Sequence, residues 1–123
     1  MQTKSNIQLI REGLAIRDSF KDNIKSFMDK YTIEDSFFGL SRNNNMYSLK
    51  ESHTMTEYTR GYFVFEHEYT DIDTAISNMT LDHTLRIVDN KRFQIGKVYE
   101  KLSEAKGDKV IDITTGKLVV DND

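Results

Sequence analysis

The chain has 123 residues with 20 acidic and 17 basic side chains and a formal net charge of −3, a length that suits one compact domain. Seven phenylalanines and six tyrosines argue against disorder, and the scattered charges exclude the strong field that a polyanion-binding protein needs. The absence of cysteine excludes disulfide frameworks, thiolate metal sites and cysteine nucleophiles.

A long amphipathic helix is predicted over residues 5–31. Apolar side chains recur there three and four positions apart, which is the spacing that places them on one face of a helix. They are Ile10, Leu14, Ile16, Phe20, Ile24, Phe27, Met28 and Tyr31. Residues 32–35 then resemble a capping box, which predicts a short helical turn through Phe37 and Phe38 that ends at Gly39.

The region from residue 46 to residue 69 is predicted to be rich in β-strands, because its apolar residues alternate and many are β-branched or aromatic. Strands are expected near 46–50, 53–59 and 62–69. A two-residue turn at Arg60-Gly61 would join the last two strands as a hairpin, with His53 opposite Glu68 on a solvated face.

Residues 71–106 are predicted to be helical. Residues 70–73 form a second capping box, and an apolar stripe in a three-four rhythm runs from Leu81 to Leu102. An alternative stays open, because residues 84–88 (Thr-Leu-Arg-Ile-Val) also suit a strand. In that case a shorter helix would cover 90–106.

A C-terminal β-hairpin is predicted over 109–121, where two apolar segments flank a Thr-Thr-Gly loop. Gly116 can adopt the left-handed conformation that such a loop needs. All these elements together predict a single domain over 1–123 of the α+β class. In it, two long amphipathic helices pack on a small antiparallel sheet that includes the hairpin.

Three potential metal ligands, His53, Glu66 and Glu68, would converge across the predicted strand hairpin. Imidazole and carboxylates are the groups that a cysteine-free chain would offer a divalent metal. A solvated sheet face with a cross-strand pair explains the same residues, so we expect no resident metal or cofactor. Phosphate-binding loops, nucleophile elbows and H-E-x-x-H are all absent, and no catalytic residue is predicted.

Contacts with a protein partner are expected from a polar loop and from tyrosine and arginine side chains of the sheet region. Three consecutive asparagines mark an exposed loop tip, and tyrosine and arginine are enriched in recognition surfaces. The candidates are Asn43, Asn44, Asn45, Tyr58, Arg60, Tyr62 and Arg92.

The sequence therefore predicts a non-catalytic, protein-binding regulator, inhibitor or adaptor. Residues with AT-rich codons far outnumber those with GC-rich codons, which favours a phage-encoded accessory protein that acts on a host protein. We expect a cytoplasmic protein without a membrane or nucleic-acid partner, since no apolar run could span a membrane and no basic aromatic platform is present. We also expect that the protein can form homo-oligomers through its helices.

Two alternatives remain at this level. One is a structural or assembly component of a virion-like complex, built from copies that join along their helices. The other is a small nucleotide-binding sensor or sponge, in which Arg60, Arg86, Arg92 and tyrosine side chains would contact the ligand.

Overall fold

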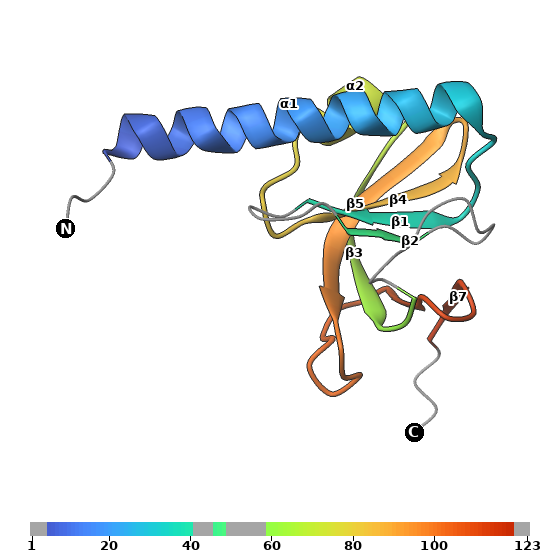
Figure 1. Cartoon of the computed structure of the whole chain (residues 1–123). Coiled ribbons are helices and arrows are strands. Elements are labelled where there is room, and N and C mark those ends of the chain that lie inside the picture. The colour runs from blue at the N-terminus through green and yellow to red at the C-terminus, as the bar shows by residue number, and fades with distance from the viewer. Residues whose placement is uncertain (1–4, 41–45, 49–58, 120–123) are drawn as a thin grey trace.

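The computed structural model of the chain describes residues 5–40, 46–48 and 59–119 (Figure 1). Its elements in chain order are α1 (Asn6–Lys30), β1 (Ser36–Gly39), β2 (Met46–Ser48), β3 (Tyr62–Tyr69), α2 (Ile72–Ser77), β4 (Thr84–Asp89), β5 (Arg92–Tyr99), β6 (Val110–Asp112) and β7 (Lys117–Leu118). The strands form one antiparallel sheet in the order β2-β1-β4-β5-β3-β6-β7. Neither helix of the described part has the length and apolar character of a membrane span.

Helix α1 corresponds to the helix predicted over 5–31, and its start is fixed by a capping box. Ser5 Oγ accepts a hydrogen bond from the Gln8 backbone N–H at 3.2 Å, and Gln8 Oε1 accepts one from the Ser5 N–H at 3.1 Å. Tyr31 is extended and ends the helix. Phe20 and Ile24 are fully buried, and they fix the second half of α1 against the sheet.

The main core lies between α1, α2 and one face of the sheet. Leu85 and Ile87 of β4 and Phe93 and Ile95 of β5 are buried there. Each pair is two residues apart, so the side chains share one face of their strand. The predicted capping box at 70–73 would make Thr70 the N-cap, but α2 starts one residue later, where Asp71 caps it by accepting a hydrogen bond from the Thr74 N–H.

The prediction of two long helices packed on a small sheet is wrong. Helix α2 covers only Ile72–Ser77, and residues 84–99 of the predicted helix form β4 and β5 at the centre of the sheet. The strand alternative for 84–88 is right, whereas the shorter helix over 90–106 is not present. Asp89 Oδ1 instead accepts a hydrogen bond from the Lys91 N–H at 2.8 Å, which closes the tight turn between the two strands.

The helical turn predicted through Phe37 and Phe38 is also wrong, because both residues belong to β1. Alternation sends Phe38 into the core under α1 and Phe37 to the opposite face, and both are fully buried. Two hydrophobic environments on opposite sides favour a strand over a helical turn.

The first strand of the hairpin predicted across Arg60-Gly61 covers residues 53–59, of which 53–58 lie outside the described residues. Within the described part, β3 pairs with β5 along one edge and with β6 along the other at Tyr62–Val64. The C-terminal hairpin is present as β6 and β7, and Gly116 has a φ of 70° in the turn between them.

The sheet curls strongly on the face away from α1. The rings of Phe37 in β1 and Phe63 in β3 meet edge to face with centroids 5.5 Å apart, although β4 and β5 lie between these strands. In a flat sheet three strand spacings would separate them by roughly 14 Å. Ile111 and Ile113 complete this second cluster, and the curl brings the β6–β7 turn toward β4 (Figure 1).

Candidate functional site

A buried arginine organises the polar groups on the curled face. Arg86 of β4 is 9% exposed, and its Nε donates to Asp35 Oδ1 at 2.8 Å. Its Nη1 donates to Gln94 Oε1 at 3.1 Å and its Nη2 to the Gly116 carbonyl at 3.2 Å. The guanidinium also lies over the Phe37 ring at 5.5 Å. These contacts tie β1, β4, β5 and the C-terminal hairpin together.

The same hydrogen-bonded chain continues through Gln94 to the opposite edge of the curled face. Gln94 Nε2 donates to Glu68 Oε1 at 2.8 Å, and Arg92 Nη2 donates to the same oxygen at 3.1 Å. The amide of Gln94, together with Arg92, holds the pKa of the Glu68 carboxyl below its usual value. Glu68 is therefore an anion at neutral pH.

A hollow of about 330 Å³ opens beside this chain of polar groups. Three cationic side chains, Arg86, Arg92 and Lys109, contribute to its wall. Phe65, Ile111 and Leu118 supply the apolar part. The Lys109 ammonium lies 4.9 Å from the centroid of the Phe65 ring.

A second polar cluster surrounds His83, just before β4. The Thr80 backbone N–H donates to His83 Nδ1 at 3.0 Å, so His83 Nε2 carries the proton and donates to Glu66 Oε2 at 3.0 Å. Asp82 accepts from the Thr80 hydroxyl and pairs with Lys97 at 3.2 Å. The Thr80 hydroxyl, with Lys97, lowers the pKa of Asp82, and Asp82 raises the pKa of Lys97.

The His83 cluster has the composition of a hydroxyl, imidazole and carboxylate relay, but its hydrogen bonds run the other way. A nucleophilic hydroxyl must donate its proton to the imidazole, whereas the Thr80 hydroxyl donates to Asp82. Both ring nitrogens of His83 are engaged. The arrangement therefore favours a structural role, in which it fixes the loop between α2 and β4.

The three candidate metal ligands do not converge in the described part of the chain. His53 lies outside it. A β-bulge between Phe65 and His67 interrupts the alternation of β3, so that Glu66 bonds to His83 while Glu68 bonds to Gln94 and Arg92. Residues 5–40 and 59–119 contain no group of three or more histidine or carboxylate ligands placed for a metal.

The predicted partner contacts do not form one surface among the described residues. Asn43, Asn44, Asn45 and Tyr58 lie outside them. Arg60 is exposed, and Tyr62 is half-buried beside Val64. Tyr62 pairs with Tyr99 at one end of β5, whereas Arg92 stands at the other end.

Sequence reasoning missed the buried pair of Arg86 and Gln94. Arg86 stands between Leu85 and Ile87, and Gln94 between Phe93 and Ile95, so strand alternation sends both polar side chains to one face. The Asp89-Asn90 turn was the available signal, because it sets these two strands opposite each other.

The first half of α1 exposes large apolar side chains, and two of them, Ile10 and Leu14, were predicted to lie on the apolar face. Ile7 is 63% exposed, Ile10 62% and Leu14 43%, while Leu9 is 38% exposed. No residue of α1 before Phe20 is fully buried. Figure 1 shows the reason, since this part of the helix extends past the edge of the sheet.

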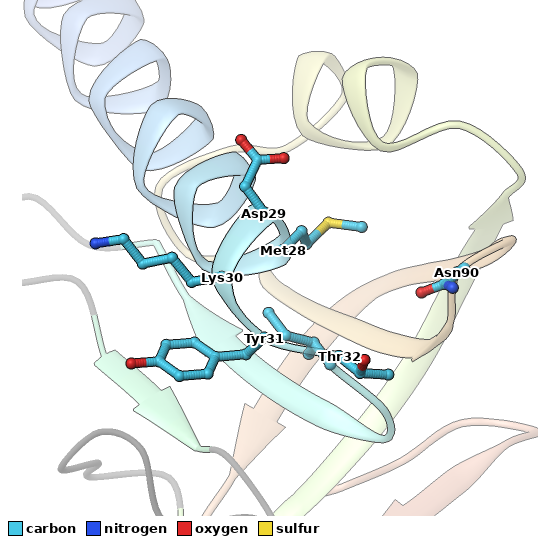
Figure 2. A pocket seen from close by; sticks show the side chains of 7 residues that line it. Met28, Asp29, Lys30, Tyr31, Thr32 and Asn90 are labelled. Carbon is cyan, nitrogen blue, oxygen red and sulfur yellow. The ribbon is translucent and has the colours of Figure 1, made fainter.

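A smaller hollow of about 200 Å³ lies where α1 ends, between Met28–Ile33 and Asn90 (Figure 2). The side chains of Asp29, Lys30 and Tyr31 point in different directions there and do not converge on a common point. This hollow follows from the change from helix to extended chain at Tyr31, and it presents no binding site.

No known protein family, curated protein or solved structure matches this chain. Two surfaces of the molecule itself then stand out. One is the exposed apolar stripe of α1, formed by Ile7, Ile10 and Leu14. The other is the cationic hollow on the curled face, to which Arg92 and Lys109 contribute.

The depressed pKa of Glu68 predicts a pH dependence of stability. The Glu68 carboxylate stabilises the fold at pH values above the pKa of the unfolded chain, which is near 4.5. This contribution is lost as the pH falls through the lower pKa of the folded protein. Because the Glu68 side chain is 37% exposed, solvent screening limits the contribution to below about 1 kcal/mol. Urea unfolding should therefore show Glu68→Gln less stable than the wild type at pH 6 and equal to it at pH 2.

The matched control is Glu104→Gln, an exposed glutamate without an ion pair in the described part of the chain. Its difference from the wild type should be close to zero at pH 6. A Glu68→Gln difference that persists unchanged at pH 2 would contradict an ionic origin.

Proposed function

We propose that the protein is a non-catalytic binding protein, a regulator, inhibitor or adaptor, that docks onto another protein through the first half of α1. The observation that carries this proposal is the apolar stripe of Ile7, Ile10 and Leu14 on a part of the helix that packs against neither core. Contiguous exposed apolar surface of this kind is typical of interaction sites.

The stripe follows a pattern of its own on the helix surface. Ile7, Ile10 and Leu14 are three and seven residues apart and form one line, whereas Leu9 continues the line of the buried Phe20. Full burial of one such side chain contributes about 1.5–3 kcal/mol. Since the three side chains keep 43–63% of their surface exposed, a part of that free energy remains for a partner.

The chemistry of the stripe favours a partner with an apolar groove. Apolar anchors at positions i, i+3 and i+7 are typical of a helix that lies in a groove. A stable flat interface needs about 20–30 residues of all kinds on each side, more than residues 6–19 of α1 supply. A groove encloses a projecting helix from several sides, so it buries more of α1 than a second copy could.

The excess of residues with AT-rich codons favours a phage-encoded protein. This origin supports a protein of the host cytoplasm as the partner. The capping box of Ser5 and Gln8 is consistent with docking, because it keeps the projecting first turn helical before a partner binds. A preformed helix loses less conformational entropy on binding.

The test is a double substitution, Ile7→Glu with Ile10→Glu. A photo-reactive residue at Arg11, an exposed position beside Ile10 and Leu14, should link α1 to its partner in host cells, and the purified partner should then bind the wild-type protein. We expect the double variant to weaken binding at least about 100-fold, because two anchors lose their burial and introduce charge. Its melting temperature should be unchanged, since neither side chain is buried in the fold.

The matched control is Ser19→Glu with Ser26→Glu, which adds the same two charges to exposed polar positions of α1. It should bind like the wild type. Equal binding by the isoleucine double variant would overturn the proposal, and so would a sedimentation result in which the stripe only joins copies of this chain into dimers or larger particles.

A further inference from the structure

The hollow on the curled face carries more positive than negative charge. Arg86, Arg92 and Lys109 reach its wall, whereas Glu68 is the one carboxylate among the described residues that line it. Asp35, which does not line the hollow, neutralises the charge of Arg86, and Glu68 neutralises that of Arg92. Lys109 has no ion pair within the described part of the chain, so the hollow keeps an excess of one positive charge.

The cations are placed so that a ligand can still reach them. Arg92 is 52% exposed, and it uses Nε and Nη2 for Glu68, which leaves Nη1 as a further donor. The Lys109 ammonium lies over the Phe65 ring, 4.9 Å from its centroid, and it has three donors. Lys109 and Arg92 both line the hollow, so each offers a charge-assisted hydrogen bond to an anionic group bound there.

The floor of the hollow makes such bonds stronger than they would be on an open surface. Gln94 is 6% exposed and Arg86 is 9% exposed, so their side chains are removed from water. Attraction between charges increases where protein atoms replace solvent. Gln94 is held on both sides, by Arg86 and by Glu68, and the floor is therefore rigid.

The other wall of the hollow is apolar. Leu118 of β7 is 55% exposed, and Ile111 and Phe65 lie beside it. An exposed leucine next to a cationic group suits a ligand with an apolar ring next to its charge. A volume of about 330 Å³ is at the small end of the range for ligand sites.

We propose that this hollow binds a small aromatic anion, with its phosphate or carboxylate group on Lys109 and Arg92 and its ring against Leu118. A nucleoside monophosphate and an aromatic carboxylate share this chemistry. The site is separate from the stripe on α1. Of the three arginines predicted to contact a nucleotide, Arg86 and Arg92 line the hollow and Arg60 does not.

Titration of the isotope-labelled protein with four probes tests the proposal. Adenosine monophosphate and benzoate represent the two sources of the anion, while adenosine and inorganic phosphate each lack one half of the ligand. We expect one or both of the aromatic anions to shift the amide signals of β3, β5 and β6 with a Kd below about 1 mM. Adenosine and phosphate should bind at least ten-fold more weakly.

The decisive variant is Lys109→Gln, with Lys101→Gln as the matched control at another exposed lysine. Loss of a charge-assisted hydrogen bond should weaken binding by about ten-fold or more for Lys109→Gln and leave Lys101→Gln unchanged. Both variants should give the amide spectrum of the folded protein. Equal binding by Lys109→Gln, or no shift with either aromatic anion, would overturn the proposal.

Discussion

Replacing Gly96 by alanine is expected to destabilise the protein by at least about 3 kcal/mol, because β3 leaves no room for a side chain at this position of β5. A Cβ at Gly96 would lie 1.9 Å from the Val64 carbonyl oxygen and 2.9 Å from two ring carbons of Phe63. The carbonyl belongs to the neighbouring strand, so relief requires that β3 and β5 separate. Urea unfolding followed by circular dichroism measures the loss.

The matched control is the same substitution at Gly13 of α1, where a Cβ would meet no atom within 4 Å. Alanine is the better helix former, so Gly13→Ala should stabilise the protein by about 0.5–1 kcal/mol. Opposite signs for two glycine-to-alanine changes would follow from local space alone. A mild effect of Gly96→Ala would contradict the close approach of β3 and β5.

Replacing Arg86 by methionine is expected to cost about 3 kcal/mol of unfolding free energy. The change keeps an apolar stem but leaves the Asp35 carboxylate without its main partner, and removal of one member of a buried ion pair is strongly destabilising. The figure is at the low end of the usual range, because the Asp35 side chain is 21% exposed. Chemical denaturation at pH 7 measures the change.

Two further variants separate the ion pair from the loss of packing. Asp35→Asn combined with Arg86→Met should recover part of the stability, because the unpaired charge is gone and asparagine tolerates the φ of 44° at this position. Arg92→Met, at an exposed pair with Glu68, should cost less than about 1 kcal/mol. Equal losses for Arg86→Met and Arg92→Met would contradict the central position of Arg86.

The elements that could be predicted from sequence are those whose signals are local. Helix α1 follows from the spacing of its apolar residues and from Ser5 at its cap, and the β6–β7 hairpin follows from a glycine that can adopt a positive φ. The stripe from Leu81 to Leu102 was misassigned because positions such as Leu85 and Ile95 satisfy both the helical and the strand period.

The two surfaces proposed for binding could not be predicted from local sequence signals. Ile10 and Leu14 belong to an apolar face by spacing, and only the edge of the sheet shows that the core stops near Phe20. The hollow needs Arg92 of β5, Lys109 just before β6 and Leu118 of β7 around one space, and these segments meet only after the sheet curls.

By itself, the sequence determined where the first helix begins and ends and where the last strands turn, since capping, turn residues and periodicity act over a few positions. The tertiary structure decided the rest. Whether residues 84–99 are helix or strand depends on β1 and β3, which supply hydrogen bonds on both sides of β4 and β5. The burial of Arg86 likewise depends on Asp35, 51 positions away, because only a distant partner compensates the loss of water.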